Sequence, residues 1–257
     1  MNAFFYTLYW GRQIAGYGRR ITNVDNRLEI VNDIHGINVF VLLIRVEEHL
    51  LHTKGRVDMT TSFDRLPTVT PASWIPGPGQ GHWTYNDYAA LPDDGKRYEI
   101  VNGVLYRTPS PTGPHQDAVG RFYAYLLTHV ETAGLGKIRI APFDVELAPD
   151  VVVQPDVFVV LKANFDKITK TRIIGAPDLV IEVSSPSTVG YDRREKQDAY
   201  ASAGVPEYWV AHPTEREVEV LVLENGKYRS LGIFEGHATL PSQVLAGLPV
   251  QVEQFFA

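Results

Sequence analysis

The stretch "APDLVIEVSSPS", residues 176–187, decides how the rest of the chain is interpreted. Leu179, Val180 and Ile181 form a continuous aliphatic run, which is typical of a short strand that is covered on both faces. Glu182 follows directly within this run. An ionised carboxylate at such a place must be paired with a cation, hydrogen-bonded or bound to a metal, because burying it alone costs too much free energy.

Side-chain alternation along this strand places Glu182 on the same face as Asp178 and Val180. A second acid stands at a comparable place, because Asp156 follows Pro155, a residue that can begin a strand but not lie inside a central one. Two such acids on adjacent strands would offer hard oxygen ligands suited to Mg²⁺, which takes only one or two carboxylates and keeps several waters. The pattern therefore indicates a metal site of the kind that serves phosphoryl transfer.

Both acids could instead have purely structural roles. Glu182 could be neutralised by an arginine such as Arg97 or Arg139, and Asp156 could terminate a turn after Pro155. Spacing alone does not choose between the metal site and these ion-pair or turn roles.

The residues around these acids predict one mixed sheet with helices packed against it, an α/β or α+β single domain. Helices are predicted at 84–91, where Thr84 is the cap, at 115–134 from an apolar stripe that ends at Gly134, and at 191–204. Asn102-Gly103 predicts a hairpin within 97–107. Further strands are predicted at 137–142, 143–147, 157–161, 178–183, 207–211, 217–223 and 227–234.

The composition is that of an ordinary globular protein, with 257 residues, of which 44% are hydrophobic and 21% are charged. The absence of cysteine excludes disulfides, thiolate zinc sites and a cysteine nucleophile, and it favours a reducing, cytoplasmic location. The apolar window at 37–44 is far shorter than the roughly 20 residues of a membrane helix. We therefore expect no membrane span and no signal peptide.

Three regions follow one another along the chain. Residues 1–58, which lie between the two methionines, lack a steady period, and we interpret them as a dispensable N-terminal extension that could come from an upstream extension of the reading frame. Residues 59–82 form a Pro/Gly-rich arm, and residues 83–257 form the domain. From residue 59 onward the chain has 17 Lys/Arg against 24 Asp/Glu, so nucleic acid would have to be met by local cationic patches.

Five segments carry a resemblance to a known family. They are "YEIVNG", "PSPTGPH", "QPDVFV", "GAPDLVIEVSSPST" and "DRREKQDAYASAGVPEYWV", and they occur in the family's order between about Trp83 and the C-terminus. In these segments the chain resembles the large bacterial family of putative restriction endonucleases within the PD-(D/E)xK nuclease superfamily. The resemblance implies a restriction-endonuclease-like core, a central mixed sheet flanked by helices, with divalent-metal ligands near the ends of two strands.

The resemblance also implies roles for individual residues. Asp156 falls on the family's Pro-Asp motif and Glu182 on its second acid, so both are expected to hold the metal. The superfamily usually places a lysine two residues after the second acid, where this chain has Ser184. Lys196 in the following helix is the natural substitute, and it would polarise or help deprotonate the attacking water or balance phosphate charge. Its alternative is a surface pair with Asp192.

Two further positions match the family outline. Glu99 could complete the metal shell, or it could be an exposed strand carboxylate beside basic neighbours. His115 could contact phosphate or shuttle a proton, or it could bond locally at the start of its helix. The chain departs from the family at His212, which stands before Pro213 where an acid is common.

Helical spacing adds a prediction about the segment after Glu182. Lys196 shares one stripe with Asp192 and Tyr200, and Arg193 and Arg194 lie to its side, where they could meet a phosphate backbone.

The sequence thus predicts a Mg²⁺-dependent endonuclease, with Mn²⁺ as the alternative ion, that hydrolyses DNA phosphodiester bonds. The competing hypothesis is a nuclease-like scaffold that has become a binding or regulatory module, which the acidic charge of the domain favours. DNA is the expected partner, and a homodimer is left open.

Overall fold

The computed structural model describes residues 69–184, 192–249 and 251–256, with only the backbone at 192–193. Before residue 69 it describes the backbone of three strands, β1 (Gly18–Val24), β2 (Arg27–Asp33) and β3 (Ile44–Arg45), which form an antiparallel sheet in the order β1-β2-β3. The chain divides into two compact units, residues 1–61 and 62–257. The dispensability of residues 1–58 stays a prediction, because most of that segment lies outside the described residues.

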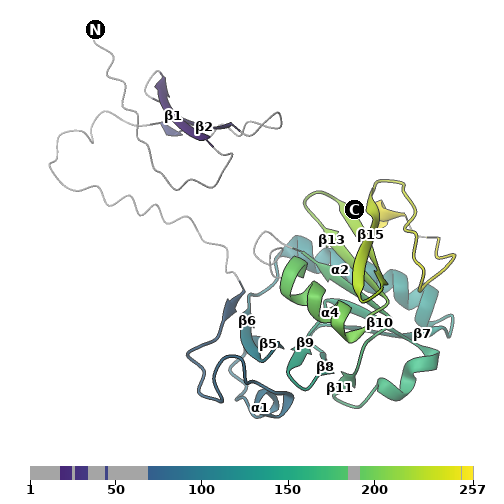
Figure 1. The fold of residues 1–257 in the computed structure, drawn as a ribbon. Helices are drawn as coiled ribbons and strands as arrows, with labels where there is room; N and C mark the ends of the chain where they lie inside the picture. The colour runs from purple at the N-terminus through teal and green to yellow at the C-terminus, as the bar shows by residue number, and fades with distance from the viewer. Residues whose placement is uncertain are drawn as a thin grey trace, which may run out of the picture. The chain divides into compact units, whose positions relative to one another are not determined.

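The first sheet of the second unit contains most of the predicted strands, in the order β15-β14-β13-β12-β10-β7 (Figure 1). Strands β12 and β13 are parallel, and the other neighbours are antiparallel, so the sheet is mixed as predicted. Its members are β7 (Gly136–Ile140), β10 (Val157–Leu161), β12 (Leu179–Val183), β13 (Glu207–His212), β14 (Glu217–Glu224) and β15 (Lys227–Glu235).

A second six-stranded sheet, in the order β11-β8-β9-β5-β6-β4, is present beside the single sheet that the sequence predicted. The predicted hairpin lies in it, and its turn residues Asn102 and Gly103 have φ angles of 52° and 70°. Residues of the Pro/Gly-rich arm contribute β4, which pairs with β6. The strands are β4 (Thr70–Pro71), β5 (Arg97–Val101), β6 (Val104–Thr108), β8 (Asp144–Ala148), β9 (Val151–Val153) and β11 (Arg172–Ile174).

Short and long helical segments connect the strands. Helix α1 begins after Thr84, whose backbone N–H and hydroxyl both donate to the Asp87 carboxylate, at 3.0 and 2.6 Å. Gly204 ends α4 with a φ of 84°, as its place in the sequence predicted. The helical segments are α1 (Tyr85–Ala89), α2 (Gly113–Leu126), the π-helical turns η2 (Leu127–Glu131) and η4 (Asp192–Lys196), the 3₁₀ turns η3 (Lys162–Lys167) and η5 (Val252–Phe255), and α4 (Gln197–Ala203).

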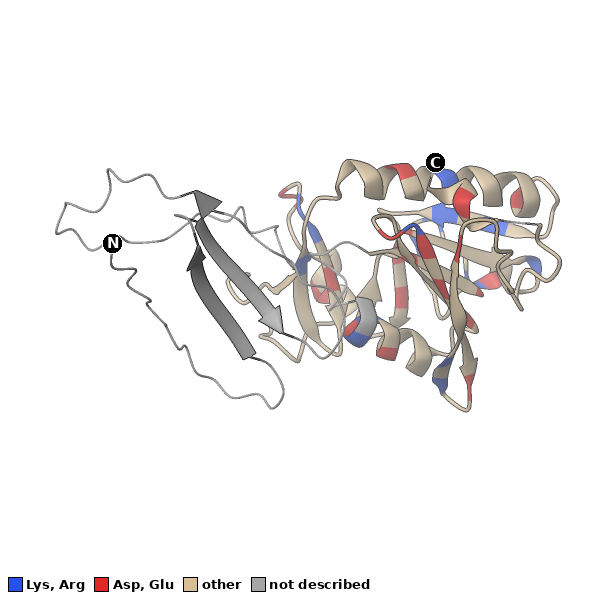
Figure 2. Ribbon diagram, turned by 90° about the horizontal axis from the view of Figure 1, so that it is seen from above, with Lys and Arg blue, Asp and Glu red and all other residues tan. Residues whose placement is uncertain are grey.

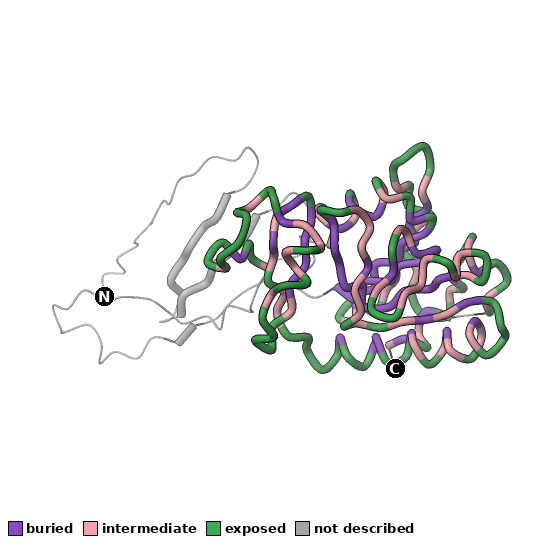
Figure 3. Tube along the Cα trace, turned by 90° about the horizontal axis from the view of Figure 1, so that it is seen from below, coloured by how far each residue is buried: buried purple, intermediate pink, exposed green. Residues whose placement is uncertain are grey.

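Buried residues gather in the interior of the second unit (Figure 3), and the two faces of the first sheet pack in different clusters. On one face, Phe122 of α2 packs in a cluster with Ile181 and Trp209. On the other, Tyr200 of α4 packs with Val180 and with residues of β8 and β9 from the second sheet. Because side chains alternate along β12, Glu182 points to this second face, as predicted. The fold is therefore α+β, and it places Glu182 between the two sheets and α4.

In the part of the chain described here, no helix combines the length and the apolar character that crossing a membrane requires.

Candidate active site

Strand pairing brings Asp156 and Glu182 together. Strands β10 and β12 are antiparallel with Val157 opposite Ile181, so Asp156, which directly precedes β10, lies beside Glu182. The backbone N–H of Val183 donates to Asp156 Oδ2 at 2.9 Å, and the N–H of Asp156 points to Glu182 Oε2 at 3.4 Å. Both side chains are buried. The two acids thus share one face of the sheet, as a common cation would require.

Lys196 reaches this pair from the end of η4. Its ammonium lies 2.9 Å from Glu182 Oε1 and 2.9 Å from Glu99 Oε1, and only 5% of the residue is exposed. A surface ion pair was the alternative role, and burial of Lys196 does not fit it; the side chain of Asp192 lies outside the described residues. The ammonium instead links acids that come from both sheets.

His115 contacts the other side of the cluster. This residue of α2 is buried, and its Nε2 lies 3.0 Å from Asp156 Oδ2. Burial alone would raise the pKa of Asp156, but the hydrogen bond from His115 and the charges of His115 and Lys196 bring that pKa below its usual value. Asp156 is therefore an ionised carboxylate at neutral pH.

Glu99 is fully buried in β5 of the second sheet. Its Oε1 accepts hydrogen bonds from the N–H of Gln154 at 2.8 Å and from Lys196, whereas Oε2 has no hydrogen-bond partner among the described residues. The alternative of an exposed strand carboxylate for Glu99 is therefore wrong. A buried carboxylate oxygen without a partner is costly, which makes this atom a place where a further cation or donor would be stabilising.

The arginines suggested as structural partners of Glu182 bind elsewhere. Arg97 donates to the side chain and carbonyl of Gln154, and Arg139 donates to the carbonyl of Ile138. Glu182 is held instead by Lys196 and by Tyr200.

Tyr200 belongs to the site, although no role was predicted for it from the sequence. Its hydroxyl donates to Glu182 Oε1 at 2.6 Å, and the residue is fully buried. Burial and the charges of Glu182 and Glu99 raise its pKa well above the usual range, so it stays a neutral donor. The signal was present, because Tyr200 follows Lys196 by one helical turn, but an aromatic residue at that spacing is typical of a core position.

The chemistry of the cluster fits a hard divalent cation. Three buried carboxylates face one ammonium and one imidazole, so a further positive charge would reduce the cost of burying the acids. Among the described residues, no three His, Asp or Glu side chains form a set that could hold a metal ion. Asp156 and Glu182 alone match Mg²⁺, which binds one or two carboxylates and several waters. Ligand roles for Asp156, Glu182 and Glu99 stay predictions.

The structure describes only one of the two arginine side chains that were predicted to contact the phosphate backbone of DNA. Arg194 is exposed on η4, two residues before the buried Lys196, whereas the side chain of Arg193 lies outside the described residues. Ser184, which occupies the place of the usual superfamily lysine, is buried, and its N–H donates to the carbonyl of Ala211 at 2.8 Å. Acidic residues are spread over strands, loops and helices rather than confined to the site (Figure 2).

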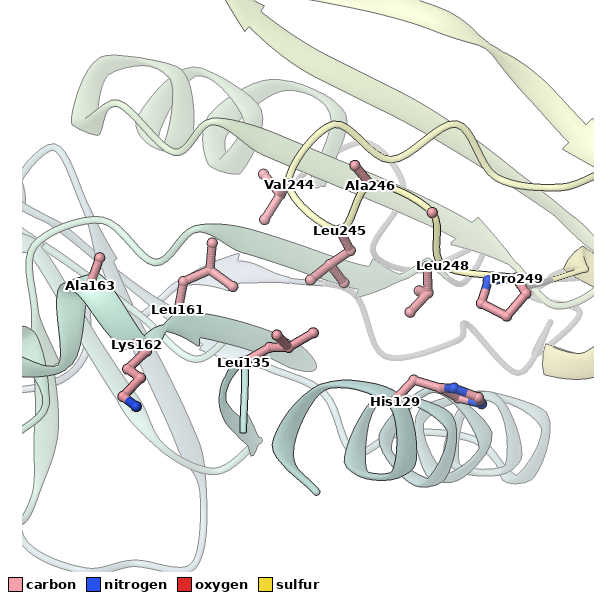
Figure 4. Close-up of a pocket in the computed structure, with 11 residues that line it drawn as sticks. His129, Leu135, Leu161, Lys162, Ala163, Val244, Leu245, Ala246, Leu248 and Pro249 are labelled. Carbon is pink, nitrogen blue, oxygen red and sulfur yellow. The ribbon is translucent and has the colours of Figure 1, made fainter. Parts of the chain in front are cut away.

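A cavity of about 530 Å³, whose lining side chains are shown in Figure 4, includes none of these acids in its wall. Aliphatic side chains form most of its wall, and no carboxylate lines it. The lining residues come from the end of η2 and the following loop, from the junction of β10 with η3, and from loop 244–249. This cavity is distinct from the acid cluster.

Comparison with known proteins identifies the family and a similar fold. A model of the family described as Uma2, putative restriction endonuclease, matches residues 85–253. A crystal structure from Anabaena variabilis ATCC 29413, described as a putative nuclease belonging to DUF820, is similar with a TM-score of 0.58 and 19% sequence identity over 68% of this chain and 97% of that chain. That likeness confirms the predicted fold, and no curated protein matches the sequence. The chain belongs to the Uma2 family of putative restriction endonucleases.

Proposed function

We propose that this protein is a divalent-metal-dependent endonuclease that hydrolyses phosphodiester bonds of DNA. The observation that carries the proposal is the buried Lys196 ammonium, which lies 2.9 Å from both Glu99 and Glu182, while Glu182 lies beside Asp156. A structural ion pair needs one acid for one lysine, whereas two acids contact this ammonium and a third, Asp156, lies beside Glu182. Membership of the restriction endonuclease family supports the same activity.

Asp156 and Glu182 are the residues that would hold the ion, Mg²⁺ or Mn²⁺. When bound, such an ion polarises a phosphoryl oxygen and lowers the pKa of a bound water. The hydrogen bond from His115 and the charges around Asp156 keep this ligand ionised and oriented.

Hydrolysis forms a bond from a water oxygen to phosphorus and breaks the bond from phosphorus to a sugar oxygen. A proton must leave the water, and the departing sugar oxygen must gain one. Lys196 supplies a positive charge and donors beside the acids, so it would balance the negative charge that develops on the phosphate. In this proposal His115 passes a proton; its Nδ1 is buried and has no hydrogen-bond partner among the described residues.

Plasmid cleavage tests the proposal. Supercoiled plasmid and single-stranded DNA are incubated with the full chain and Mg²⁺, Mn²⁺ or EDTA, and cleavage is expected with either metal and not with EDTA. Lys196→Ala should lower the cleavage rate by about a hundredfold to a thousandfold, because it removes a charge positioned for the transition state. Lys170→Ala, which truncates an exposed lysine outside the cluster, is the matched control and should cut at the parental rate.

Two outcomes would contradict the proposal. A Lys196→Ala protein that cuts at the parental rate would show that Lys196 takes no part in cleavage. A purified parental chain that binds DNA without cutting it under any metal condition would favour the inactive binding module.

A further inference from the structure

We propose that Tyr200 is a positioning residue that fixes Glu182 so that one carboxylate oxygen, Oε2, is presented to the cation. This inference rests on the proposed function, because it concerns how the same acid receives its metal. Sequence resemblance assigned Tyr200 no role, and the geometry of the cluster carries the argument.

The two oxygens of Glu182 have different surroundings. Oε1 accepts two donors from the same helical segment, the Tyr200 hydroxyl at 2.6 Å and the Lys196 ammonium at 2.9 Å. Oε2 lies 3.4 Å from the backbone nitrogen of Asp156, whose N–H points toward it. Oε2 is therefore the oxygen turned toward Asp156.

Tyr200 is itself held in place by packing. It is fully buried, it belongs to the cluster that includes Val180, and its ring centroid lies 5.2 Å from that of Tyr208. A tyrosine has two side-chain torsions, so a packed ring places its hydroxyl with little remaining freedom. The hydroxyl is thus a fixed donor in α4, one turn beyond Lys196.

A neutral donor suits this task better than a second cation. Lys196 is shared with Glu99, and its positive charge offsets part of the negative charge that a metal ion needs. Tyr200 orients Glu182 without neutralising it. Hydrogen-bonding partners of this kind orient metal-ligating carboxylates, and their loss typically lowers metal affinity or activity by about 10- to 100-fold.

Removal of one hydroxyl tests the inference. Tyr200→Phe keeps the ring, and Mn²⁺ binding to the full chain is measured by isothermal titration calorimetry together with thermal unfolding. Tyr228→Phe is the matched control, because the ring of Tyr228 also neighbours Tyr208, while its hydroxyl donates to the carbonyl of Val205 at 2.9 Å and to none of the three acids. Tyr200→Phe should bind Mn²⁺ about 10- to 100-fold more weakly than the parental chain, and Tyr228→Phe within about twofold of it.

The possible failures are distinguishable. A parental chain that binds no Mn²⁺ would contradict the proposed function, and with it this inference. A parental chain that binds Mn²⁺ while Tyr200→Phe binds it equally well would overturn the role of Tyr200 alone. A Tyr200→Phe chain without cooperative unfolding would assign the hydroxyl to the stability of the fold and would also overturn the inference.

Discussion

Two buried glutamates on neighbouring strands have different surroundings. Glu182 lies near the end of β12 and Glu207 at the start of β13, and since these strands are parallel, the two acids lie toward opposite ends of the pair. Glu207 is fully buried and accepts hydrogen bonds from Trp209 Nε1 at 2.7 Å and from the N–H groups of Gln243 at 2.7 Å and Val244 at 3.0 Å. Its donors are all neutral.

The contrast shows that burial of a carboxylate does not by itself mark a functional site. Three N–H groups donate to the Glu207 carboxylate, and two of them connect the loop at Gln243 and Val244 to the first sheet. Glu182 instead shares its surroundings with two further acids and one ammonium. The concentration of acids, which the fold alone does not need, distinguishes the candidate active site.

Glu207→Ala should produce the largest loss of stability in this comparison. The substitution leaves the indole N–H and two backbone N–H groups without their acceptor, and each buried unsatisfied donor costs about 1–3 kcal/mol. We expect the free energy of unfolding in urea to fall by about 3 kcal/mol or more. A loss below about 1 kcal/mol would show that Glu207 does not anchor the loop.

Glu131 is a third carboxylate for the comparison, and it is partly exposed. Its substitution is expected to have the smallest effect on the free energy of unfolding. Burial would raise its pKa, but the bonds from Lys137 Nζ at 2.8 Å and from the N–H of Ile138 at 3.0 Å lower that pKa overall. A carboxylate with a lowered folded-state pKa contributes stability that is present above its unfolded pKa, about 4.3, and is lost as pH falls through the folded value.

Glu131→Gln should therefore reduce the free energy of unfolding by less than about 1 kcal/mol at pH 7, because a partly exposed pair is screened by solvent. Urea unfolding of both chains at pH 7 and pH 3 checks this, and the difference should shrink at the lower pH. A difference that grows as pH falls would mean that the sign of the pKa shift is wrong.

The sequence predicted the elements that carry strong local signals. The apolar stripe that includes Phe122 indicated α2, Gly204 indicated the end of α4, and Asn102-Gly103 indicated the hairpin. The second sheet was not predicted as separate, because β9 and β11 have three residues each, too few to show an alternating pattern. Nothing local in the sequence shows that β5 faces the end of β12.

Only part of the candidate site was predicted, because its other part also depends on contacts that have no local signal in the sequence. Motifs and the resemblance identified Asp156, Glu182 and Lys196, and the structure brings the three together. The contact of Lys196 with Glu99 depends on how two sheets pack, which no spacing in the sequence encodes. No role was predicted for Tyr200, because its helical spacing is the same whether it only packs in the core or also donates a hydrogen bond to an acid.

The most direct test of the account compares DNA cleavage by Asp156→Asn and Glu207→Gln, each at a temperature where the chain is folded. Both substitutions replace a buried carboxylate by an amide of similar size, but only Asp156 belongs to the acid cluster. With Mg²⁺ and supercoiled plasmid, we expect Asp156→Asn to lose about a thousandfold in rate and Glu207→Gln to stay within a few-fold of the parental chain. Cleavage by Asp156→Asn at the parental rate would contradict the assignment of this cluster as the active site.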